Sequence, residues 1–280
     1  MANRIRNFEV KKDDAWVLTY PKCGTTWTEE IVWLLRNDLN FEKALKIRQA
    51  DRSIFIEEGL FMGEGMALMP VEQAENLPSP RQIKSHLPIA LLPKELMEVK
   101  PKIIYVVRDP RDVVVSYYHH YRIIAGFTGP LDEFVDAFVE DSLCYSPYWE
   151  TILEFWDLRH EDHILFLTYE DMKKNLRSVI DKLCDFFGKS YSDEQIAALE
   201  DHVSFNSMKN NPQVNKQDII DLRAKHIGFE PPKDVKFIRQ GQAGGWKNEL
   251  SEESRRKIEQ WSRNALKNTD YPPLEDMLDE

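Results

Sequence analysis

Residues 19–27, with the sequence TYPKCGTTW, constrain the fold of this chain more than any other stretch. They follow a short apolar run at residues 15–18, which predicts a buried strand, and they precede apolar side chains at helical spacing. A strand, a loop of small residues and a helix bring free backbone N–H groups and the positive end of a helix dipole to one point. A phosphate or sulfate group fits at such a point, with Lys22 as a positive charge beside it.

This loop is not a Walker A motif, which needs its glycines before the lysine and a hydroxyl residue directly after it. Here Lys22 comes first, and Gly24, Thr25 and Thr26 follow. Taken alone, the loop is equally consistent with an ordinary turn that carries a surface lysine.

Charge and composition limit the classes of partner. The formal net charge is −11, from 37 basic and 48 acidic residues, which argues against a general nucleic-acid binder. The chain has no uncharged apolar run long enough to span a membrane, and residues 1–14 do not read as a secretory signal. The three cysteines, Cys23, Cys144 and Cys184, lack metal-ligand spacing and are too few for a disulfide framework. We therefore expect a cytoplasmic protein with no nucleic-acid or membrane partner and no metal.

Further strands are expected along the chain. Residues 102–107 and 164–168 read as continuous buried strands of a parallel sheet, and residues 81–88 as a short strand that ends at a turn. Helices are expected between and after them, one of which stops at Gly188. Residues 37–80 and 204–236 show little periodicity. The alternation predicts an α/β fold: a single domain over residues 1–280, with a central, mostly parallel sheet flanked by helices and a P-loop-like first loop.

Basic side chains recur where these strands end. Lys84 and His86 lie at the end of the strand in residues 81–88, and Arg108 directly follows residue 107. Ligands of α/β sheets collect outside the carboxyl ends of the strands, so Arg108 is placed to meet an anion there. Arg239 precedes a segment with three glycines in five residues, where backbone approaches a ligand closely.

Four segments together resemble the cytosolic sulfotransferase family: residues 19–27, 84–88, 108–118 and 239–247 match its motifs in order and with comparable spacing. The first loop matches the family's YPKSGTTW with only the serine changed, to Cys23. The resemblance extends from about residue 13 to the C-terminus and implies an enzyme of this family. It also implies 3′-phosphoadenosine 5′-phosphosulfate (PAPS) as donor and adenosine 3′,5′-bisphosphate (PAP) as product, with no metal.

The resemblance also implies roles for individual residues. His86 would be the general base toward the acceptor hydroxyl, Lys22 would stabilise the leaving phosphate, and Lys84 would stabilise the sulfuryl oxygens. The implied donor-binding residues are Lys22, Cys23, Gly24, Thr25, Thr26, Trp27, Arg108, Ser116, Tyr169, Phe205, Arg239, Gln240 and Gly241. Sulfuryl transfer would then combine a general base with in-line positioning and electrostatic stabilisation.

The chain departs from the family pattern at three kinds of position. Gln240 stands where a lysine is usual, which removes one positive charge near the 3′-phosphate. Val203 stands where a threonine is frequent, which removes a hydrogen bond to the donor. Residues 247–252 lack the Thr-Val centre of the family's dimerisation motif, so a homodimer is possible but not implied by that motif.

The acceptor is expected to be a small phenol or alcohol. An apolar pocket for it is predicted from Phe55, Phe61, Met62, Phe127 and Tyr145, because flexible and aromatic side chains form adaptable pockets. Three alternatives remain open at this point: a retinol-dehydratase-like enzyme that acts through a sulfate ester, a non-catalytic module that binds PAP, and a P-loop kinase that needs Mg²⁺ and ATP.

Overall fold

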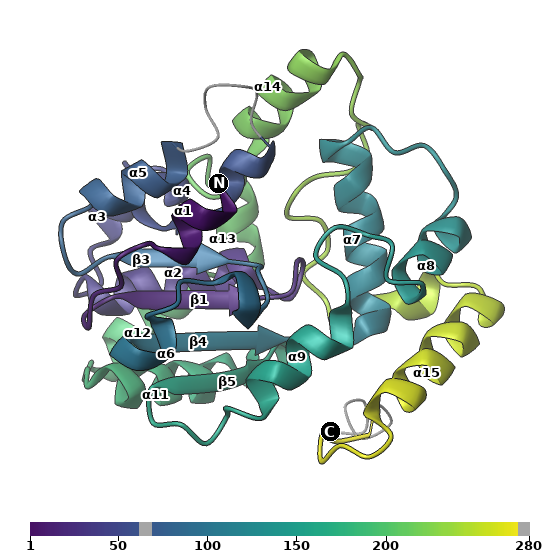
Figure 1. Cartoon of the computed structure of the whole chain (residues 1–280). Coiled ribbons are helices and arrows are strands. Elements are labelled where there is room, and N and C mark those ends of the chain that lie inside the picture. Colours follow the sequence, from purple (N-terminus) through teal and green to yellow (C-terminus); the bar gives the residue numbers. More distant parts are fainter. Residues whose placement is uncertain (62–68, 274–280) are drawn as a thin grey trace.

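The computed structural model describes residues 1–61 and 69–273, and a five-stranded sheet lies at its centre (Figure 1). The strand order is β2-β3-β1-β4-β5, and each neighbouring pair is parallel. The strands are β1 (Ala15–Thr19), β2 (Ile54–Phe55), β3 (Gln82–Ser85), β4 (Lys102–Val107) and β5 (Ile164–Thr168). The predicted α/β class is confirmed, and the sheet is parallel throughout the described strands.

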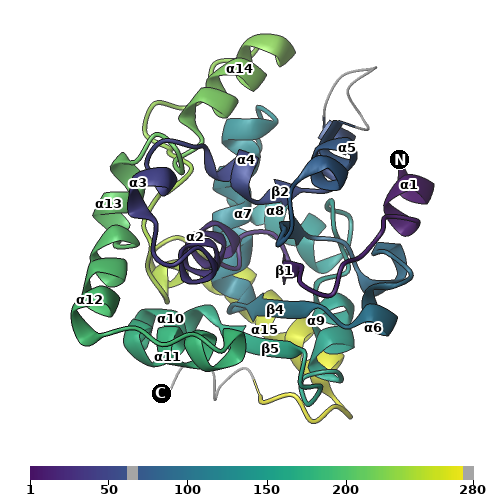
Figure 2. The same ribbon diagram turned by 90° about the vertical axis from the view of Figure 1, so that its left-hand side faces the viewer.

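Helices connect the strands and cover both faces of the sheet (Figure 2). The α-helices are α1 (Ala2–Arg6), α2 (Thr25–Arg36), α3 (Phe41–Ala44), α4 (Gln49–Arg52), α5 (Met69–Asn76), α6 (Leu96–Val99), α7 (Pro110–Ile124), α8 (Leu131–Val139), α9 (Tyr148–Trp156), α10 (Tyr169–Lys174), α11 (Leu176–Phe187), α12 (Asp193–His202), α13 (Phe205–Asn210), α14 (Gln217–Ile227) and α15 (Glu252–Leu266). Three short 3₁₀ turns are η1 (Glu58–Phe61), η2 (Ile89–Leu91) and η3 (Gly245–Asn248).

Alternation along β1 divides the interior into two cores. Trp16 and Leu18 belong to the core shared with α7, α9 and α15, whereas Ala15 and Val17 belong to the core shared with α2, α11 and α12. All five residues of β1 are buried, which agrees with the continuous apolar run of its sequence. Burial on both faces fixes the strand in the middle of the sheet.

Chain order reverses around β1, because β3 pairs on one side of it and β4 on the other. Such a reversal leaves a crevice at the carboxyl ends of the strands, where α/β proteins bind ligands. The loops that follow β1, β3, β4 and β5 all meet at this edge of the sheet. The predicted site residues at strand ends are therefore brought together by topology alone.

Helix α7 begins at Pro110, although three consecutive valines follow at residues 113–115. Its N-cap is Asp109, whose Oδ1 accepts the backbone N–H of Arg111 at 2.8 Å. The valines are all buried in the core, so packing outweighs their preference for strands. Gly188 ends α11 with φ +62°, as predicted, and Ser192 and Gln195 form a capping box at the start of α12.

Two segments that show little periodicity in the sequence are more regular than expected. Within the described residues of 37–80 lie β2 and the short helices α3, α4 and α5, and within 204–236 lie α13 and α14. Apart from α5, which has eight residues, and α14, these elements have only two to six residues, too few to establish a period. Helix α14 is longer, but most of its side chains are polar and only Ile220 and Ala224 are buried.

Candidate active site

The loop between β1 and α2 has the geometry of an anion site. Lys22 and Gly24 adopt positive φ angles of 72° and 95°, and the N–H of Cys23 donates to the carbonyl of Tyr20 at 3.4 Å. Within the described chain, the N–H groups of Gly24, Thr25 and Thr26 donate to no carbonyl or side chain. Free N–H groups at the start of a twelve-residue helix bind phosphate or sulfate. The Cys23 thiol itself is buried in the core, and burial raises its pKa.

Two glycines allow aromatic rings to approach the backbone here. A Cβ atom on Gly24 would lie 2.8 Å from the Tyr169 ring, and one on Gly241 would lie 2.4 Å from the Phe205 ring. Both distances are shorter than van der Waals contact. Trp27 meets Tyr169 edge to face, with ring centroids 5.8 Å apart. An aromatic slot beside the loop is thus formed by Trp27, Tyr169 and Phe205. A flat purine base fits a slot of this kind.

The Arg108 side chain contacts the loop after β1, the segment around Gln242 and the Tyr169 ring, so it does not extend freely toward a ligand. Its guanidinium donates to the carbonyls of Lys22 at 3.3 Å and Gln242 at 2.7 Å, and it lies 4.3 Å from the centre of the Tyr169 ring. Nε of Arg108 is buried with no hydrogen-bond partner among the described residues. Asp112, one helical turn on, accepts the N–H groups of Gly244 at 2.6 Å and Trp246 at 3.0 Å. Arg108 and Asp112 together hold the glycine-rich segment, residues 239–247, against the loop between β1 and α2.

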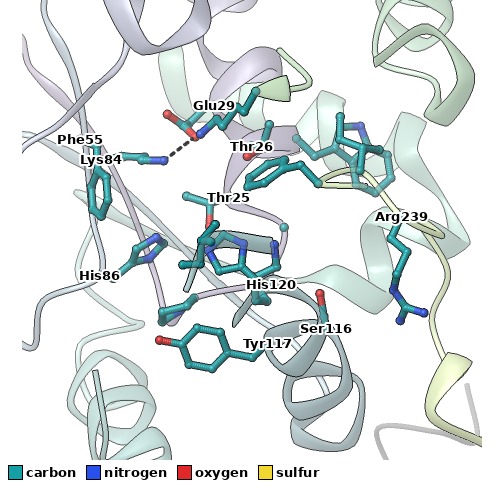
Figure 3. Close-up of a pocket in the computed structure, with 18 of the residues that line it drawn as sticks. Thr25, Thr26, Glu29, Phe55, Lys84, His86, Ser116, Tyr117, His120 and Arg239 are labelled. Carbon is teal, nitrogen blue, oxygen red and sulfur yellow. Dashed lines mark ion pairs between the residues drawn. The ribbon is translucent and has the colours of Figure 1, made fainter. Parts of the chain in front are cut away.

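Arg239 is paired with an acid that the sequence analysis did not consider. Its guanidinium lies 2.6 Å from Glu249, whose other oxygen is 2.5 Å from Nε2 of His119. Hydrogen bonds from His119 and Arg239 outweigh partial burial and lower the pKa of Glu249 to about 2. Gln240 also donates to Glu249, at 3.4 Å. Ser116 faces the same cavity from α7 (Figure 3).

Lys22 occupies a site of strong positive potential. Burial, followed by the charges of Lys216 and Arg108, lowers the pKa of Lys22 to about 7. Its ammonium lies 4.5 Å from the centre of the Phe237 ring and forms no salt bridge within the described chain. A lysine in this situation regains its full charge when an anion binds beside it.

Lys84 and His86 leave β3 on the same side of the cavity (Figure 3). Lys84 is buried and lies 3.5 Å from Glu29. The Nδ1 atom of His86 lies 2.8 Å from the carbonyl oxygen of Thr19, and its backbone N–H donates to Glu57 at 2.6 Å. Burial, with the Lys84 charge, lowers the pKa of His86 to about 3, and burial raises that of Glu57 to about 7. His86 is therefore neutral at physiological pH.

One cavity of about 390 Å³ brings most of these residues together. It is lined by Lys22, Gly24, Thr25, Thr26, Trp27, Phe55, Phe61, Lys84, His86, Arg108, Ser116, Tyr145, Tyr169, Phe205, Arg239, Gln240 and Gly241, among others. An aromatic wall beside His86 is formed by Phe55, Phe61 and Tyr145. Neighbouring rings in this group, including the His86 ring, have centroids 5.2–6.4 Å apart. Val203 also lines the cavity.

Three of the residues predicted to form the site need separate mention. Phe127 does not line this cavity, because it packs against Tyr118 and Phe134 instead. The side chain of Cys23 lies in the core beside Trp16 and Leu18, so that only its backbone borders the loop. Met62 lies outside the described residues.

Of the cavity residues that the sequence did not predict, Lys216 and His120 bear most on its chemistry. Lys216 directly precedes α14, in a stretch without clear periodicity, and His120 lies in the middle of α7. His120 is one helical turn from Ser116, so the spacing to that predicted residue was a usable signal for it. No feature of the sequence distinguishes Lys216 from a surface lysine.

Comparison with known proteins agrees with this geometry. A model of the sulfotransferase domain matches residues 12–270. The chain belongs to the sulfotransferase family. The expected family and the expected class of enzyme are thereby confirmed.

Individual sulfotransferases resemble the chain over most of its length. It is 39% identical to luciferin sulfotransferase of Photinus pyralis, over 98% of this chain and 77% of that protein. It is 36% identical to sulfotransferase 1A1 of Bos taurus, over 87% of this chain and 80% of that protein. A crystal structure of retinol dehydratase in complex with retinol and PAP superimposes with a TM-score of 0.87 at 33% identity, covering 97% and 86% of the two chains.

Two kinds of feature are absent from the part of the chain that the structure describes. None of the helices there is both long and apolar enough to cross a membrane. The same residues contain no cluster of three or more His, Cys, Asp or Glu side chains that could hold a metal ion. The prediction of a metal-free reaction is not tested by this finding and stays a prediction.

Proposed function

We propose that this protein transfers the sulfuryl group of PAPS to the hydroxyl of a small phenol or alcohol. The observation that carries the proposal is the position of His86, a neutral imidazole beside Lys84 in a cavity that also contains an anion-binding loop. Nδ1 of His86 faces the carbonyl of Thr19, which can only accept, so Nδ1 carries the proton and Nε2 has the free lone pair. Nε2 has no hydrogen-bond partner among the described residues, which leaves it available to a substrate hydroxyl.

The residues present fit the proposed donor. The unpaired N–H groups of Gly24, Thr25 and Thr26 suit its 5′-phosphate, and the slot of Trp27, Tyr169 and Phe205 suits its adenine. Arg108, Ser116 and Arg239, with the backbone of Gln240 and Gly241, lie on the side proposed for the 3′-phosphate. Retinol dehydratase, at 33% identity, has been crystallised with PAP, which supports the same ligand here.

The chain's own residues would divide the reaction between them. His86 Nε2 takes the proton of the acceptor hydroxyl as that oxygen bonds to sulfur, while the bond from sulfur to the phosphate oxygen breaks and the phosphate keeps the electron pair. Lys22 stabilises the charge on that phosphate, and Lys84 stabilises the sulfuryl oxygens. The donor supplies an already activated sulfuryl group. The aromatic wall of Phe55, Phe61 and Tyr145 excludes water and positions an apolar acceptor.

The proposal is tested with ³⁵S-labelled PAPS and a panel of phenols, steroids and retinoids. We expect a labelled sulfate ester from at least one class of acceptor, without added metal. Nucleotide binding with no labelled product from any acceptor would contradict transfer and favour a binding module. Transfer that requires ATP and Mg²⁺ instead of PAPS would favour a kinase.

A dehydratase is the second candidate, and the similarity to retinol dehydratase supports it. In that reaction a sulfate ester forms first and is then eliminated. Mass spectrometry of retinol incubations distinguishes the two candidates: a sulfated product supports simple transfer, and a dehydrated product without sulfate supports elimination.

We further propose a cytoplasmic location, because the three cysteines are free in the part of the chain that the structure describes, as is usual in a reducing compartment. A homodimer stays a possibility that gel filtration would decide.

A further inference from the structure

Lys216 introduces a positive charge into the cavity that the donor does not account for. We infer that Lys216 and His120 form a binding site for an anionic group on the acceptor, so that preferred acceptors are hydroxylated carboxylic acids. The inference rests on the proposed sulfuryl transfer and specifies its substrate class. It assigns the hydroxyl of the acceptor to His86 and its carboxylate to Lys216.

The ring of Phe237 marks the position of this site. The ammonium of Lys216 lies 5.1 Å from the ring centre, and the His120 ring meets the Phe237 ring edge to face at 5.6 Å. Lys216, Phe237 and His120 all line the cavity. In the view of Figure 3, His120 lies between His86 and Ser116. This polar wall is made of different residues from the aromatic wall around His86.

Neither polar group of this wall forms an ion pair with an acid in the described part of the chain, although Lys216 lies beside Lys84 and feels the charges of Glu29 and Glu58. Lys216 forms no salt bridge within the described chain, and Nδ1 of His120 is buried without a hydrogen-bond partner there. Buried polar groups in proteins are nearly always paired, so an unpaired lysine and an unpaired imidazole facing one cavity indicate a polar ligand. Burial and the charge of Lys84 lower the pKa of Lys216 to about 7, and a bound anion would restore its charge.

The balance of charge in the cavity favours an anion over a neutral group. Its lining includes seven Lys and Arg side chains, and only two acids, Glu29 and Glu58. Glu29 lies 3.5 Å from Lys84, so it already offsets that charge. The formal charge of the whole chain is −11, so the positive potential is local to this cavity. An acceptor with a carboxylate would be attracted into it, and a cationic amine would be repelled.

Lys216 comes from a segment that also supplies residues beside the aromatic wall, although Lys22 contacts the same Phe237 ring, at 4.5 Å. Lys216 directly precedes α14, whose cavity-facing residues include Ile220 and Arg223. The guanidinium of Arg223 donates to the carbonyl of Phe61 at 3.3 Å, and the Phe61 ring stacks on Phe55 in the aromatic wall. The residues proposed for the donor come from other segments, namely the loop after β1, the start of α7 and residues 239–241.

The test compares matched acceptors and two lysine variants. The acceptors are phenols that carry a carboxylate on arms of increasing length, 4-hydroxybenzoate, 4-hydroxyphenylacetate and 3-(4-hydroxyphenyl)propanoate, each beside its methyl ester. Lys216→Met keeps an unbranched side chain at the same backbone position while removing the charge. Lys225→Met, on the exposed face of α14, is the matched control. Calorimetry measures acceptor binding to the PAP-saturated protein, and labelled PAPS measures kcat/KM.

We expect the natural protein to prefer at least one acid over its ester by about tenfold or more, the effect of one charge-assisted hydrogen bond. Lys216→Met should lose that preference, leave the ester within about threefold, and leave the affinity for PAP unchanged. His120→Phe should weaken binding of the acid more than binding of the ester. Lys225→Met should behave like the natural protein.

Three results would overturn the inference: esters bound as well as acids at every arm length, equal losses for acid and ester in Lys216→Met, or a large loss of PAP affinity in that variant. The last result would assign Lys216 to the donor. Sulfation of the esters alone would leave the proposed function standing while rejecting the carboxylate site. Absence of any sulfation would reject the proposed function, and the binding measurements on the PAP complex would still decide the site.

Discussion

The Nδ1 atom of His86 lies 2.8 Å from the carbonyl oxygen of Thr19 on the neighbouring strand. This contact follows from the register of the sheet, in which Leu18 pairs with Ser85, so that Thr19 at the end of β1 lies beside His86, the first residue after β3. Because a carbonyl only accepts, the contact fixes the tautomer of the imidazole, and Oγ1 of Thr19 also lies 3.2 Å from the same nitrogen. The fold itself therefore aims the basic nitrogen at the cavity.

The tautomer and the protonation state of His86 are open to direct measurement. In ¹⁵N-histidine-labelled protein, we expect His86 to show the Nδ1–H pattern and no titration between pH 5 and pH 8. Burial and the Lys84 charge lower its pKa to about 3, so the neutral form persists as the pH falls through this range. His86→Gln assigns the signal. A titration midpoint near the ordinary value of about 6.5, or an Nε2–H pattern, would contradict the description of this base.

Donor binding should take up protons above neutral pH. Lys22 has a pKa of about 7 in the free protein, so at pH 8 much of it is neutral, and a bound anion raises its pKa again. We expect calorimetry of PAP binding in buffers of different ionisation enthalpy to show proton uptake at pH 8 and little at pH 6, with affinity falling as the pH rises.

Lys22→Met should remove most of that uptake and weaken PAP binding by about tenfold or more. The free variant should be as stable as the natural protein or more so, by roughly 1 kcal/mol, because an unpaired buried charge is lost. Unchanged proton uptake in this variant would assign the titrating group elsewhere.

Glu249 holds Arg239 in an ion pair at 2.6 Å, and its charge also opposes a phosphate nearby. We expect Glu249→Gln to tighten PAP binding by roughly threefold to tenfold, since both effects disappear while a hydrogen-bonding amide remains. Titration of PAP into the variant and into the natural protein, at two salt concentrations, measures the dissociation constant for PAP in each. Weaker binding in the variant would mean that Glu249 positions Arg239 for the ligand instead of competing with it.

Gly241→Ala should damage nucleotide binding through Phe205. The new Cβ would lie 2.4 Å from the Phe205 ring at a φ of +61°, so the ring or the loop must move. We expect a loss of PAP affinity of about tenfold or more. Gly188→Ala is a matched control, because it has nearly the same φ, +62°, and nothing lies within 4 Å of its new Cβ. Both variants should lose roughly 1 kcal/mol of stability, but only Gly241→Ala should lose affinity.

The strands at the centre of the sheet could be predicted from the sequence because burial on both faces makes them continuous apolar runs. The strand at residues 102–107 has the predicted bounds, and the places of Lys84, His86 and the first loop follow from strand ends, whereas the role of His86 as base is an implication of the family resemblance and stays a prediction. By contrast, β2 has only two residues, and its neighbour β3 supplies the pairing that defines it. A two-residue strand has no sequence period.

The missed parts of the site depend on contacts between distant segments. Lys216 differs from an ordinary surface lysine only because Phe237, some twenty residues on, folds against it. The pairing of Arg239 with Glu249 likewise depends on the turn at η3, which Asp112 holds from α7. Residue type alone predicts Phe127 in the pocket, but packing against Phe134 turns it toward α8.

The most direct test of the catalytic assignment compares sulfate transfer from labelled PAPS in the natural protein and in His86→Ala. The account predicts a loss of about 10²–10⁴ in kcat with the dissociation constant for PAP unchanged within threefold. His160→Ala, at an exposed turn before β5, should retain full activity. Undiminished turnover in His86→Ala would contradict the role of this imidazole as the base.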